Sequence, residues 1–476
     1  MGDNGINVSK KDVIWSFVAK FFQMATGILV LPLILNRLSS EEIALNYLML
    51  TISSMVALLD FGFAPQFGRN FTYVYSGSRS LQKEGVVTDG GEGIDYHLLS
   101  VLLLTAKGVY RKISLACLLL MLLGGSFYIY YITNGFSLVN NSLLIWLLFS
   151  FSTFITVYSS FYNSLLVGSG KISEANKAII LSKTTYIVVC CVLLLLNFGL
   201  FSVVLATFSA PLVQILYSHT KYYTKQLREK LDFEVSSSEV KEMFSTIWYN
   251  AKKLGLSFVG GYAVTKSSMF IIGFYLSLEE IASYGLLVQI GSAVTAIAST
   301  LFITYHPKCA NCRVSKDYNR FKEIMSVTML FYLAVMLAGY LGVVFLLDYA
   351  LVIIRSNAAL PSILITSLYF IYITLEGNHS NFASLITTDN KVPFLGASLI
   401  SGGFIVLLTV LTLQFTNLGL LGVVLVPLLV QLAYNNWRWP KWVLDELNLS
   451  YWGMLRIGMN RVVDLSRNIV HKSNNR

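Results

Sequence analysis

The first candidate for chemistry in this sequence is a lysine in the middle of an apolar segment. Lys266 is the only charged residue of Leu254–Leu276, which reads LGLSFVGGYAVTKSSMFIIGFYL. As a helix, this segment would be roughly 34 Å long, enough to cross a bilayer, with Lys266 roughly 15 Å from its nearer end. A charge at that depth costs at least about 2.5–3.5 kcal/mol unless it meets water or a partner. We therefore predict that Lys266 either pairs with a carboxylate on another helix or lines a hydrated internal cavity.

Among the other ionisable residues within apolar segments, four are of interest: Lys20, Asp60, Glu376 and His379. Lys20 and Asp60 would lie at equal depth on the first two spans, which predicts an ion pair between these helices or a gate that opens during transport. Glu376 and His379 belong to a polar run that must face a bundle interior or a cavity rather than lipid. We expect these four residues to serve gating or ion coupling.

The sequence offers no constellation typical of an enzyme or a metal site. The five histidines have no metal-ligand spacing, and the pair Cys309 and Cys312 with His306 supplies at most three of the four ligands that zinc needs. No P-loop is present, so ATP is not expected as the direct energy source. We predict no bound cofactor, and proton or sodium coupling stays open.

The composition is that of a polytopic all-α membrane protein. The 476 residues are 55% hydrophobic and 13% charged, with a mean hydropathy of +0.64, whereas soluble domains carry about 25% charged residues. The apolar segments are too long and too uniform for the alternating strands of an outer-membrane barrel. The N-terminus lacks the features of a cleaved secretory signal, so the first span is expected to remain.

The hydropathy pattern predicts 12 transmembrane helices. They are Val13–Leu35, Ile43–Phe63, Ile113–Ile132, Ser142–Val167, Ala178–Leu196, Leu200–Ser218, Leu254–Leu276, Ile281–Thr304, Ser326–Leu347, Leu360–Thr387, Pro393–Leu413 and Leu418–Tyr434.

The distribution of basic residues predicts the orientation. Of the 35 lysines and arginines, 30 fall in the termini and loops on one side, two on the other (Arg37 and Arg355) and three within spans. Because cytoplasmic loops are enriched in lysine and arginine, both termini are predicted to be cytoplasmic. This bias also accounts for the net charge of +10 without a nucleic-acid partner.

The two halves of the chain repeat a short pattern. Leu38–Ala44 reads LSSEEIA and Leu276–Ala282 reads LSLEEIA, each between a first and a second span of its half. Six spans separate the copies, so the halves would be parallel repeats related by an axis along the membrane normal. We predict an N-terminal lobe at residues 1–218, a cytoplasmic linker at 219–253, a C-terminal lobe at 254–437 and a basic tail at 438–476.

Two stretches are amphipathic rather than apolar throughout. His97–Ser114 and Trp452–Val470 combine apolar residues with basic ones. Both are predicted to be helices on the cytoplasmic membrane surface, held there by apolar burial and by attraction to anionic lipid.

Several segments resemble the O-antigen flippases (Wzx) of the multidrug/oligosaccharidyl-lipid/polysaccharide (MOP) exporter superfamily. They are Leu31–Leu50 (LPLILNRLSSEEIALNYLML), Leu58–Asn70 (LLDFGFAPQFGRN), the LLSVLLLTAKGVYRKIS stretch and Ile271–Ile290 (IIGFYLSLEEIASYGLLVQI). The chain departs from this family at Ser268 and Met269, where relatives often carry an Asp-Arg pair, and Lys266 is the nearest charge.

The resemblance implies a MATE-like fold of two six-helix lobes around a central cavity, working by alternating access. It implies a bacterial inner-membrane protein that moves undecaprenyl-pyrophosphate-linked O-antigen units to the periplasmic leaflet, in partnership with other polysaccharide-assembly membrane proteins. Such cargo needs cations for its pyrophosphate and hydroxyl or ring groups for its sugars, which favours Lys266, Tyr262 and Thr265 as substrate-binding residues.

Three other classes compete with this interpretation. A MATE-type drug or cation antiporter would need anionic cavity residues, and Asp60, Glu376 and Asp389 keep that alternative open. An O-antigen polymerase or polyprenyl glycosyltransferase would need a large catalytic loop, whereas the outer loops here are short. A major-facilitator transporter should carry a Gly-x-x-x-Asp-Arg motif, which Gly68–Thr72 does not match.

Overall fold

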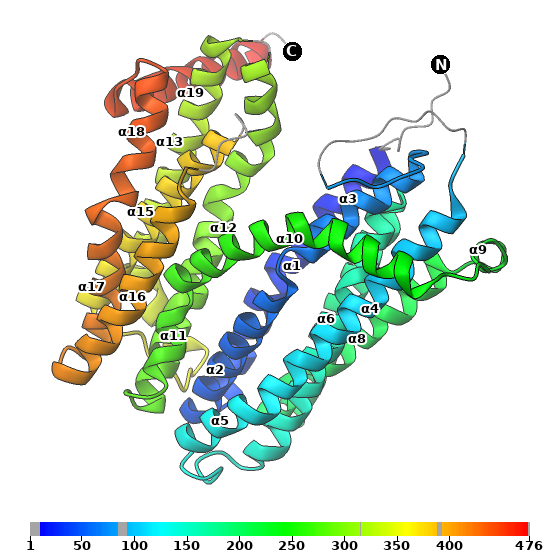
Figure 1. Ribbon diagram of the computed structural model, residues 1–476. Helices are drawn as coiled ribbons and strands as arrows, with labels where there is room; N and C mark the ends of the chain where they lie inside the picture. The colour runs from blue at the N-terminus through cyan, green and yellow to red at the C-terminus, as the bar shows by residue number, and fades with distance from the viewer. Residues whose placement is uncertain (1–9, 84–92, 315, 388–392, 475–476) are drawn as a thin grey trace. The chain divides into compact units, whose positions relative to one another are not determined.

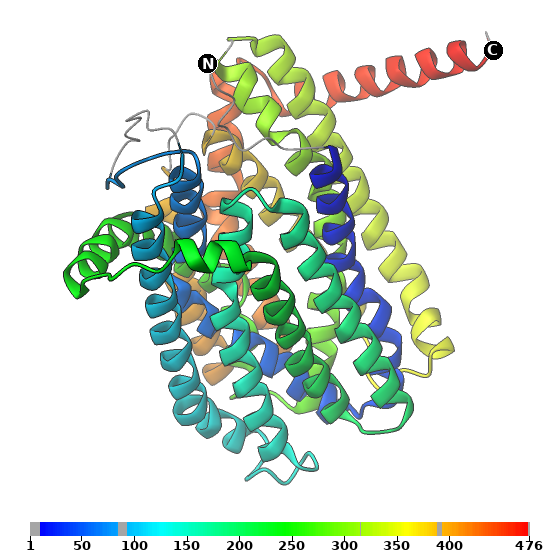
Figure 2. The same cartoon turned by 90° about the vertical axis from the view of Figure 1, so that its right-hand side faces the viewer.

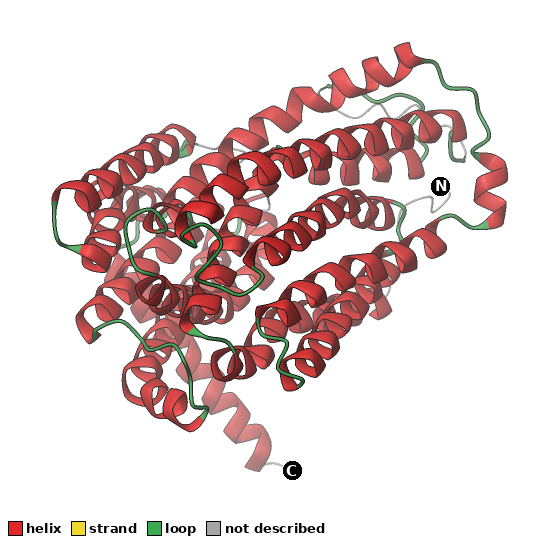
Figure 3. Cartoon of the chain, turned by 90° about the horizontal axis from the view of Figure 1, so that it is seen from below, coloured by secondary structure: helices red, strands yellow, loops and turns green. Residues whose placement is uncertain are grey.

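The computed structural model describes residues 10–83, 93–314, 316–387 and 393–474, and all regular elements in these ranges are helices (Figure 3). The chain divides into two compact units, Met1–Val259 and Gly260–Arg476. One long helix, α10 (Ser237–Thr265), begins in the first unit and ends in the second (Figure 1).

The first unit is built around α6 and α8. α6 packs against α3, α4 and α8, while α7 packs between α1 and α8. Its core contains Phe67, Phe71, Tyr110, Phe161 and Tyr222. The helices are α1 (Lys10–Arg37), α2 (Ser40–Val56), α3 (Phe63–Tyr75), α4 (Tyr96–Leu120), α5 (Ser126–Ile132), α6 (Ser142–Gly168), α7 (Ile172–Leu195), α8 (Leu200–Tyr222) and α9 (Lys225–Lys230).

The second unit is built around α12, α13 and α15. α15 packs against α12, α17 and α18, and α13 packs against α12 and α19. Its core contains Phe321, Met325, Phe382, Trp439 and Met454. The helices are α11 (Ser267–Ile272), α12 (Leu278–Val314), α13 (Tyr318–Gly342), α14 (Asp348–Ile353), α15 (Ile363–Thr387), α16 (Leu395–Phe415), α17 (Gly419–Ala433), α18 (Asn435–Glu446) and α19 (Tyr451–Asn474).

Ten helical segments of the described ranges are long and apolar enough to cross a membrane. They correspond to ten of the 12 predicted spans, and the total of 12 stays a prediction. Of the other two predicted spans, Leu254–Leu276 contains a broken helix, and Leu360–Thr387 contains a run of polar residues. The polytopic all-α architecture predicted from composition is confirmed.

One local prediction is wrong. The stretch His97–Ser114 is no separate surface helix, because α4 runs through it from Tyr96 to Leu120 and continues through a π turn into α5. The apolar residues of this stretch, Leu99, Leu102, Leu103 and Ala106 among them, are buried inside the first unit. The predicted tail helix is present as α19, whose distal part extends away from the other helices of its unit (Figure 2).

The repeated LSxEEIA motif forms the same structure in both units. Ser39 and Glu42 make a capping box at the start of α2, in which each side chain accepts the other residue's backbone N–H. Ser277 and Glu280 do the same before α12, with N···O distances of 3.1 and 3.3 Å. A capping box satisfies two amide groups that the first helical turn leaves unbonded, so the motif is retained at two equivalent helix starts.

Two further features recur in the same order. The third long segment of each unit is interrupted by a π turn, Met121–Gly125 in one and Val343–Leu347 in the other. The last apolar helix of each repeat starts at a glycine with positive φ: Gly199 (58°) is the N-cap of α8, and Gly419 (50°) is the first residue of α17. Each glycine lies beside its capping-box glutamate, since a Cβ atom would be 2.5 Å from Glu42 Oε1 or 3.8 Å from Glu280 Oε1. These parallels support an internal duplication.

We expect Gly199→Ala to lower the free energy of unfolding by about 1–3 kcal/mol, because alanine is strained at this positive φ. Gly419→Ala should cost less, since its Cβ has more room. The control is Gly403→Ala, inside α16 with no atom within 4 Å of the new Cβ. Thermal unfolding of the purified protein in detergent measures all three, and equal stability of the Gly199 and Gly403 variants would contradict the duplicated glycine–glutamate contact.

Candidate functional site

The helix that carries Lys266 is broken at this residue. α10 ends at Thr265 and α11 begins at Ser267, while Lys266 adopts φ −128° and ψ −20° between them. The single continuous helix predicted for Leu254–Leu276 is therefore wrong. No proline or glycine lies at the break, although these are the residues that usually cause sharp kinks.

Side chains satisfy the carbonyl groups that the break leaves free. In a regular helix the Ala263 and Val264 carbonyls would accept from the amides four residues later. Here Ser267 Oγ donates to the Ala263 carbonyl at 2.5 Å, and Tyr372 Oη of α15 donates to the Val264 carbonyl at 3.2 Å. A buried carbonyl left without a partner costs about 1–3 kcal/mol, so these two bonds stabilise the broken conformation.

A neighbouring helix packs closely against the turn before the break. A Cβ atom on Gly402 of α16 would lie 2.8 Å from Ala263 Cβ and 3.3 Å from the Gly260 carbonyl oxygen. Only glycine permits this approach without a shift of one helix. The backbone leading to Lys266 is thus positioned by α15 through a hydrogen bond and by α16 through close packing.

Lys266 lines a cavity of about 420 Å³ within the second unit. The walls come from α10, α11, α12, α15 and α17, and they combine aromatic rings with small polar groups. The aromatic residues are Tyr284, Tyr369 and Tyr372, and the polar residues include Thr265, Lys266, Ser292, Thr295, Glu376 and Asn381. Its volume falls within the range of about 300–1,000 Å³ that is typical of ligand-binding pockets.

Glu376 lies on the same cavity and is part of a buried polar network. Its Oε2 atom is 3.6 Å from His379 Nδ1, and the side chain of Gln431 also hydrogen-bonds to its carboxylate. His379 Nδ1 is 2.9 Å from Asn436 Oδ1, and Gln431 Oε1 accepts from Asn435 Nδ2 at 2.6 Å. The network connects α15, α17 and α18.

Three buried polar atoms of this region have no hydrogen-bond partner: Glu376 Oε2, Asn381 Nδ2 and Asn436 Nδ2. Buried polar groups are nearly always paired in proteins, and exceptions require an explanation such as an ion, a water molecule or a ligand. Among the described residues, Lys266 and Glu376 do not form an ion pair, although they line the same cavity. The cation and the carboxylate are therefore both available to a ligand.

Lys20 and Asp60 are not brought together. Asp60 Oδ1 accepts from Tyr110 Oη at 2.7 Å and its Oδ2 from the Ala64 amide at 3.2 Å, whereas Lys20 is exposed on α1. The described residues contain no ion pair between the two. Asp60 instead ties the turn between α2 and α3 to α4, because two neutral donors satisfy its carboxylate. Equal depth was not enough to predict an ion pair, because it does not determine how each helix is rotated about its axis.

The structure thus places Thr265, Lys266 and Glu376 on one cavity with His379 in contact with Glu376, all in the second unit. Tyr262 precedes the break by one turn and does not line this cavity. Sequence analysis missed Tyr372, Gln431 and Asn436. Gln431 could have been identified from the sequence, because it is the only residue of the 15-residue helix α17 whose side chain can hydrogen-bond.

We expect Tyr372→Phe to lower the free energy of unfolding by about 1–3 kcal/mol, because the Val264 carbonyl would lose its partner. The matched control is Tyr369→Phe, one turn earlier on α15 and on the same cavity. No hydrogen bond of the Tyr369 hydroxyl is found among the described residues. Thermal unfolding in detergent would show a clear loss for the first variant alone, and equal effects would mean that Tyr372 does not support the break.

Comparisons with known proteins identify the fold. A MATE-family multidrug transporter of the MOP superfamily in an inward-facing conformation superimposes with a TM-score of 0.59 and 14% identity, over 90% of this chain and 95% of that one. The lipid II flippase MurJ, inward closed, gives 0.60 and 15% identity over 97% of this chain and 93% of that one. A Vibrio cholerae MATE transporter gives 0.52 and 13% identity, covering 92% and 97%.

No protein-family model and no curated protein sequence matches this chain. At these identities the structural similarity establishes the fold alone. The chain therefore has the MATE-like fold of the MOP transporters, as the sequence predicted, and it is a multi-pass membrane protein.

Proposed function

We propose that this protein is a flippase for a lipid-linked oligosaccharide, and that Lys266 binds the pyrophosphate of the substrate. The observation that carries this proposal is a lysine at a helix break that lines a cavity of about 420 Å³. The proposed cargo is an undecaprenyl-pyrophosphate-linked O-antigen unit. It would move from the cytoplasmic to the periplasmic leaflet of the bacterial inner membrane by alternating access.

The composition of the cavity supports an anionic sugar-bearing head group. A pyrophosphate carries negative charge that cannot cross hydrocarbon alone, and a lysine ammonium attracts it while donating hydrogen bonds. Sugars are bound by aromatic faces and hydroxyl groups, which Tyr284, Tyr369, Ser292 and Thr295 would supply. The polyprenyl tail has no need of a polar path, because it is soluble in the membrane.

The fold is compatible with this cargo, since one protein with a similar structure is named a lipid II flippase. We further propose that Glu376 and His379 couple transport to a proton or cation gradient. Their support is that Glu376 Oε2 accepts no hydrogen bond although it lies 3.6 Å from His379 Nδ1. Protonation or cation binding there would neutralise a buried charge and could change the packing of α15 against α17 and α18.

A second candidate function is a MATE-type antiporter for cationic drugs. It is favoured by the buried Glu376 carboxylate and by the MATE transporters that share the fold. Lys266 argues against it, because a fixed cation on the cavity wall repels a cationic substrate. A flippase needs Lys266, whereas a drug antiporter would be improved by its removal.

The test is replacement of Lys266 in cells that depend on this protein for surface polysaccharide. Lys266→Arg should retain much of the transport because it keeps the positive charge, whereas Lys266→Gln should lose it by about tenfold or more, the value of one charge-assisted hydrogen bond. The matched control is Lys183→Gln, which removes the charge from Lys183 of α7 in the other unit. Protein amount in the membrane should stay normal in all three.

Normal surface polysaccharide from a well-expressed Lys266→Gln variant would rule out the role of Lys266. A structural role makes a different prediction. If Lys266 served only to neutralise Glu376, Lys266→Gln would lower the amount of folded protein, and the exchanged pair Lys266→Glu with Glu376→Lys would restore it.

A further inference from the structure

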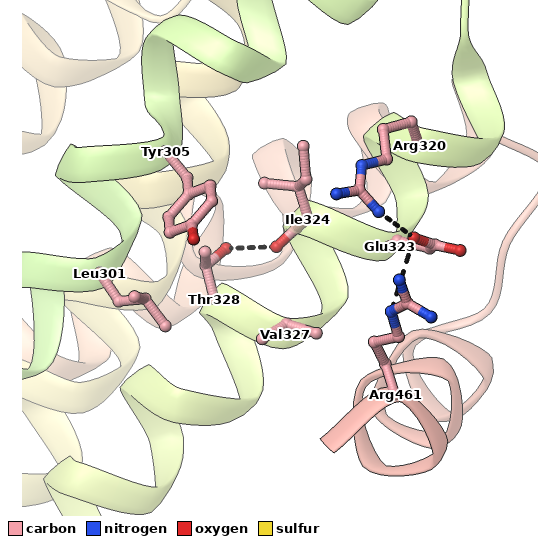
Figure 4. A pocket seen from close by; sticks show the side chains of 8 residues that line it. All are labelled: Leu301, Tyr305, Arg320, Glu323, Ile324, Val327, Thr328 and Arg461. Atoms are coloured by element: carbon pink, nitrogen blue, oxygen red, sulfur yellow. Dashed lines mark hydrogen bonds and ion pairs between the residues drawn. The ribbon is translucent and has the colours of Figure 1, made fainter. Parts of the chain in front are cut away.

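A second pocket of about 350 Å³ lies between α12, α13 and α19. Its wall is divided by polarity. Leu301 of α12 and Ile324 and Val327 of α13 form the apolar part, while Arg320 and Glu323 of α13 and Arg461 of α19 form the charged part (Figure 4). The pocket is separate from the Lys266 cavity and shares no lining residue with it.

The charged part has an excess of positive charge. Arg320 Nη1 lies 2.7 Å and Arg461 Nε lies 3.8 Å from the same oxygen, Glu323 Oε2, and Figure 4 shows both guanidinium groups directed at this carboxylate. Two arginines and one glutamate leave one net positive charge. All three side chains are 37–40% exposed, so their remaining N–H donors can reach an anion. The ammonium of Lys308 adds a further cation, 6.0 Å from the ring centroid of Tyr305 at the pocket.

The pocket lies where two apolar spans end. One span closes at His306 and the next opens at Tyr318, so Arg320 and Glu323 belong to the first turns of α13 and Val327 lies deeper along it. If these spans cross the bilayer, the charged part would be level with lipid head groups and the apolar part level with acyl chains. This order, from charge to hydrocarbon, matches the structure of an anionic phospholipid.

The helix that supplies Arg461 is amphipathic and tightly seated. A Cβ atom on Gly458 would lie 2.6 Å from the Ser326 carbonyl oxygen of α13, which fixes α19 against α13 one turn before Arg461. On its open side α19 exposes Trp452 (81%) and Met459 (53%). Apolar and basic residues on one surface helix are typical of a segment that lies in the membrane interface.

We propose that this pocket binds an anionic membrane phospholipid, with its phosphate between Arg320 and Arg461 and one acyl chain along Leu301, Ile324 and Val327. Arginine forks suit phosphate oxygens, because they donate two parallel hydrogen bonds. On binding, the phosphate competes with Glu323 for the two guanidinium groups. The lipid then joins α19 to the bundle at the membrane surface. This inference is independent of the transported substrate.

The first experiment is native mass spectrometry of the full-length protein, delipidated in detergent and titrated with phosphatidylglycerol or phosphatidylcholine. The protein should retain phosphatidylglycerol at least fivefold better than phosphatidylcholine. The double variant Arg320→Gln with Arg461→Gln should lose this preference. The matched control, Arg111→Gln with Lys112→Gln, removes the same charge from exposed residues of α4 and should keep it. Equal lipid retention by the two double variants would overturn the proposal.

A third variant separates lipid binding from a purely structural ion-pair cluster. Glu323→Gln frees both arginines for the phosphate, so phosphatidylglycerol retention should rise by at least twofold. If the cluster only fastens α19 to α13, the same change would loosen α19 and retention would stay equal or fall, which would contradict the proposal. This readout stays informative even where the double arginine variant folds poorly.

The same mass-spectrometric assay tests whether the bound phosphate belongs to a lipid or is free inorganic phosphate. Inorganic phosphate at the concentration of the lipid should not displace phosphatidylglycerol, because it lacks the acyl chain. Leu301→Trp, which fills the apolar part and keeps all charges, should reduce lipid retention by at least threefold. Displacement by inorganic phosphate together with unchanged retention in Leu301→Trp would show a simple anion site and would refute the lipid assignment.

Discussion

The structure of the second unit depends on the backbone carbonyls that are set free where α10 ends at Lys266. A buried carbonyl without a hydrogen-bond partner is unfavourable, so donors from the protein stabilise the broken conformation. Tyr372 supplies one from α15 and Ser267 supplies another from the break itself. α15 supplies a donor and α16 packs closely at this level, and Lys266 and Glu376 line the cavity beside the break.

The two units share local structural features, but only the second carries a polar site of this kind among the described residues. Capping boxes, π turns and positive-φ glycines recur at equivalent places in both. These features belong to helix starts and interruptions, where backbone groups need partners whatever the function. The carboxylate of Asp60 in the first unit accepts hydrogen bonds from Tyr110 and Ala64, whereas Glu376 Oε2 accepts no hydrogen bond and lies 3.6 Å from His379 Nδ1. The two units therefore resemble each other at helix starts and interruptions and differ in their buried polar groups.

The sequence predicted what depends on composition and local pattern. Apolar runs revealed the helices, the LSxEEIA repeat marked two equivalent helix starts, and a lone charge in an apolar segment marked Lys266. Features set by contacts between helices were missed or wrong. No glycine or proline at Lys266 indicates the helix break in the sequence. Tyr372, which donates to the Val264 carbonyl beside the break, lies more than 100 residues away in sequence. The prediction of a Lys20–Asp60 ion pair was wrong because depth along a helix does not determine which way a side chain points.

The most direct test of the central claim is transport by the purified protein in liposomes. The vesicles would contain an undecaprenyl-pyrophosphate-linked oligosaccharide with a fluorescent sugar, and a membrane-impermeant quencher would report the leaflet that holds it. Parallel vesicles would contain a fluorescent cationic drug in place of the lipid-linked sugar. The account predicts that the sugar crosses between leaflets with the wild-type protein and that Lys266→Gln abolishes this, while the drug is not moved. Transport of the drug with no movement of the lipid-linked sugar would contradict it.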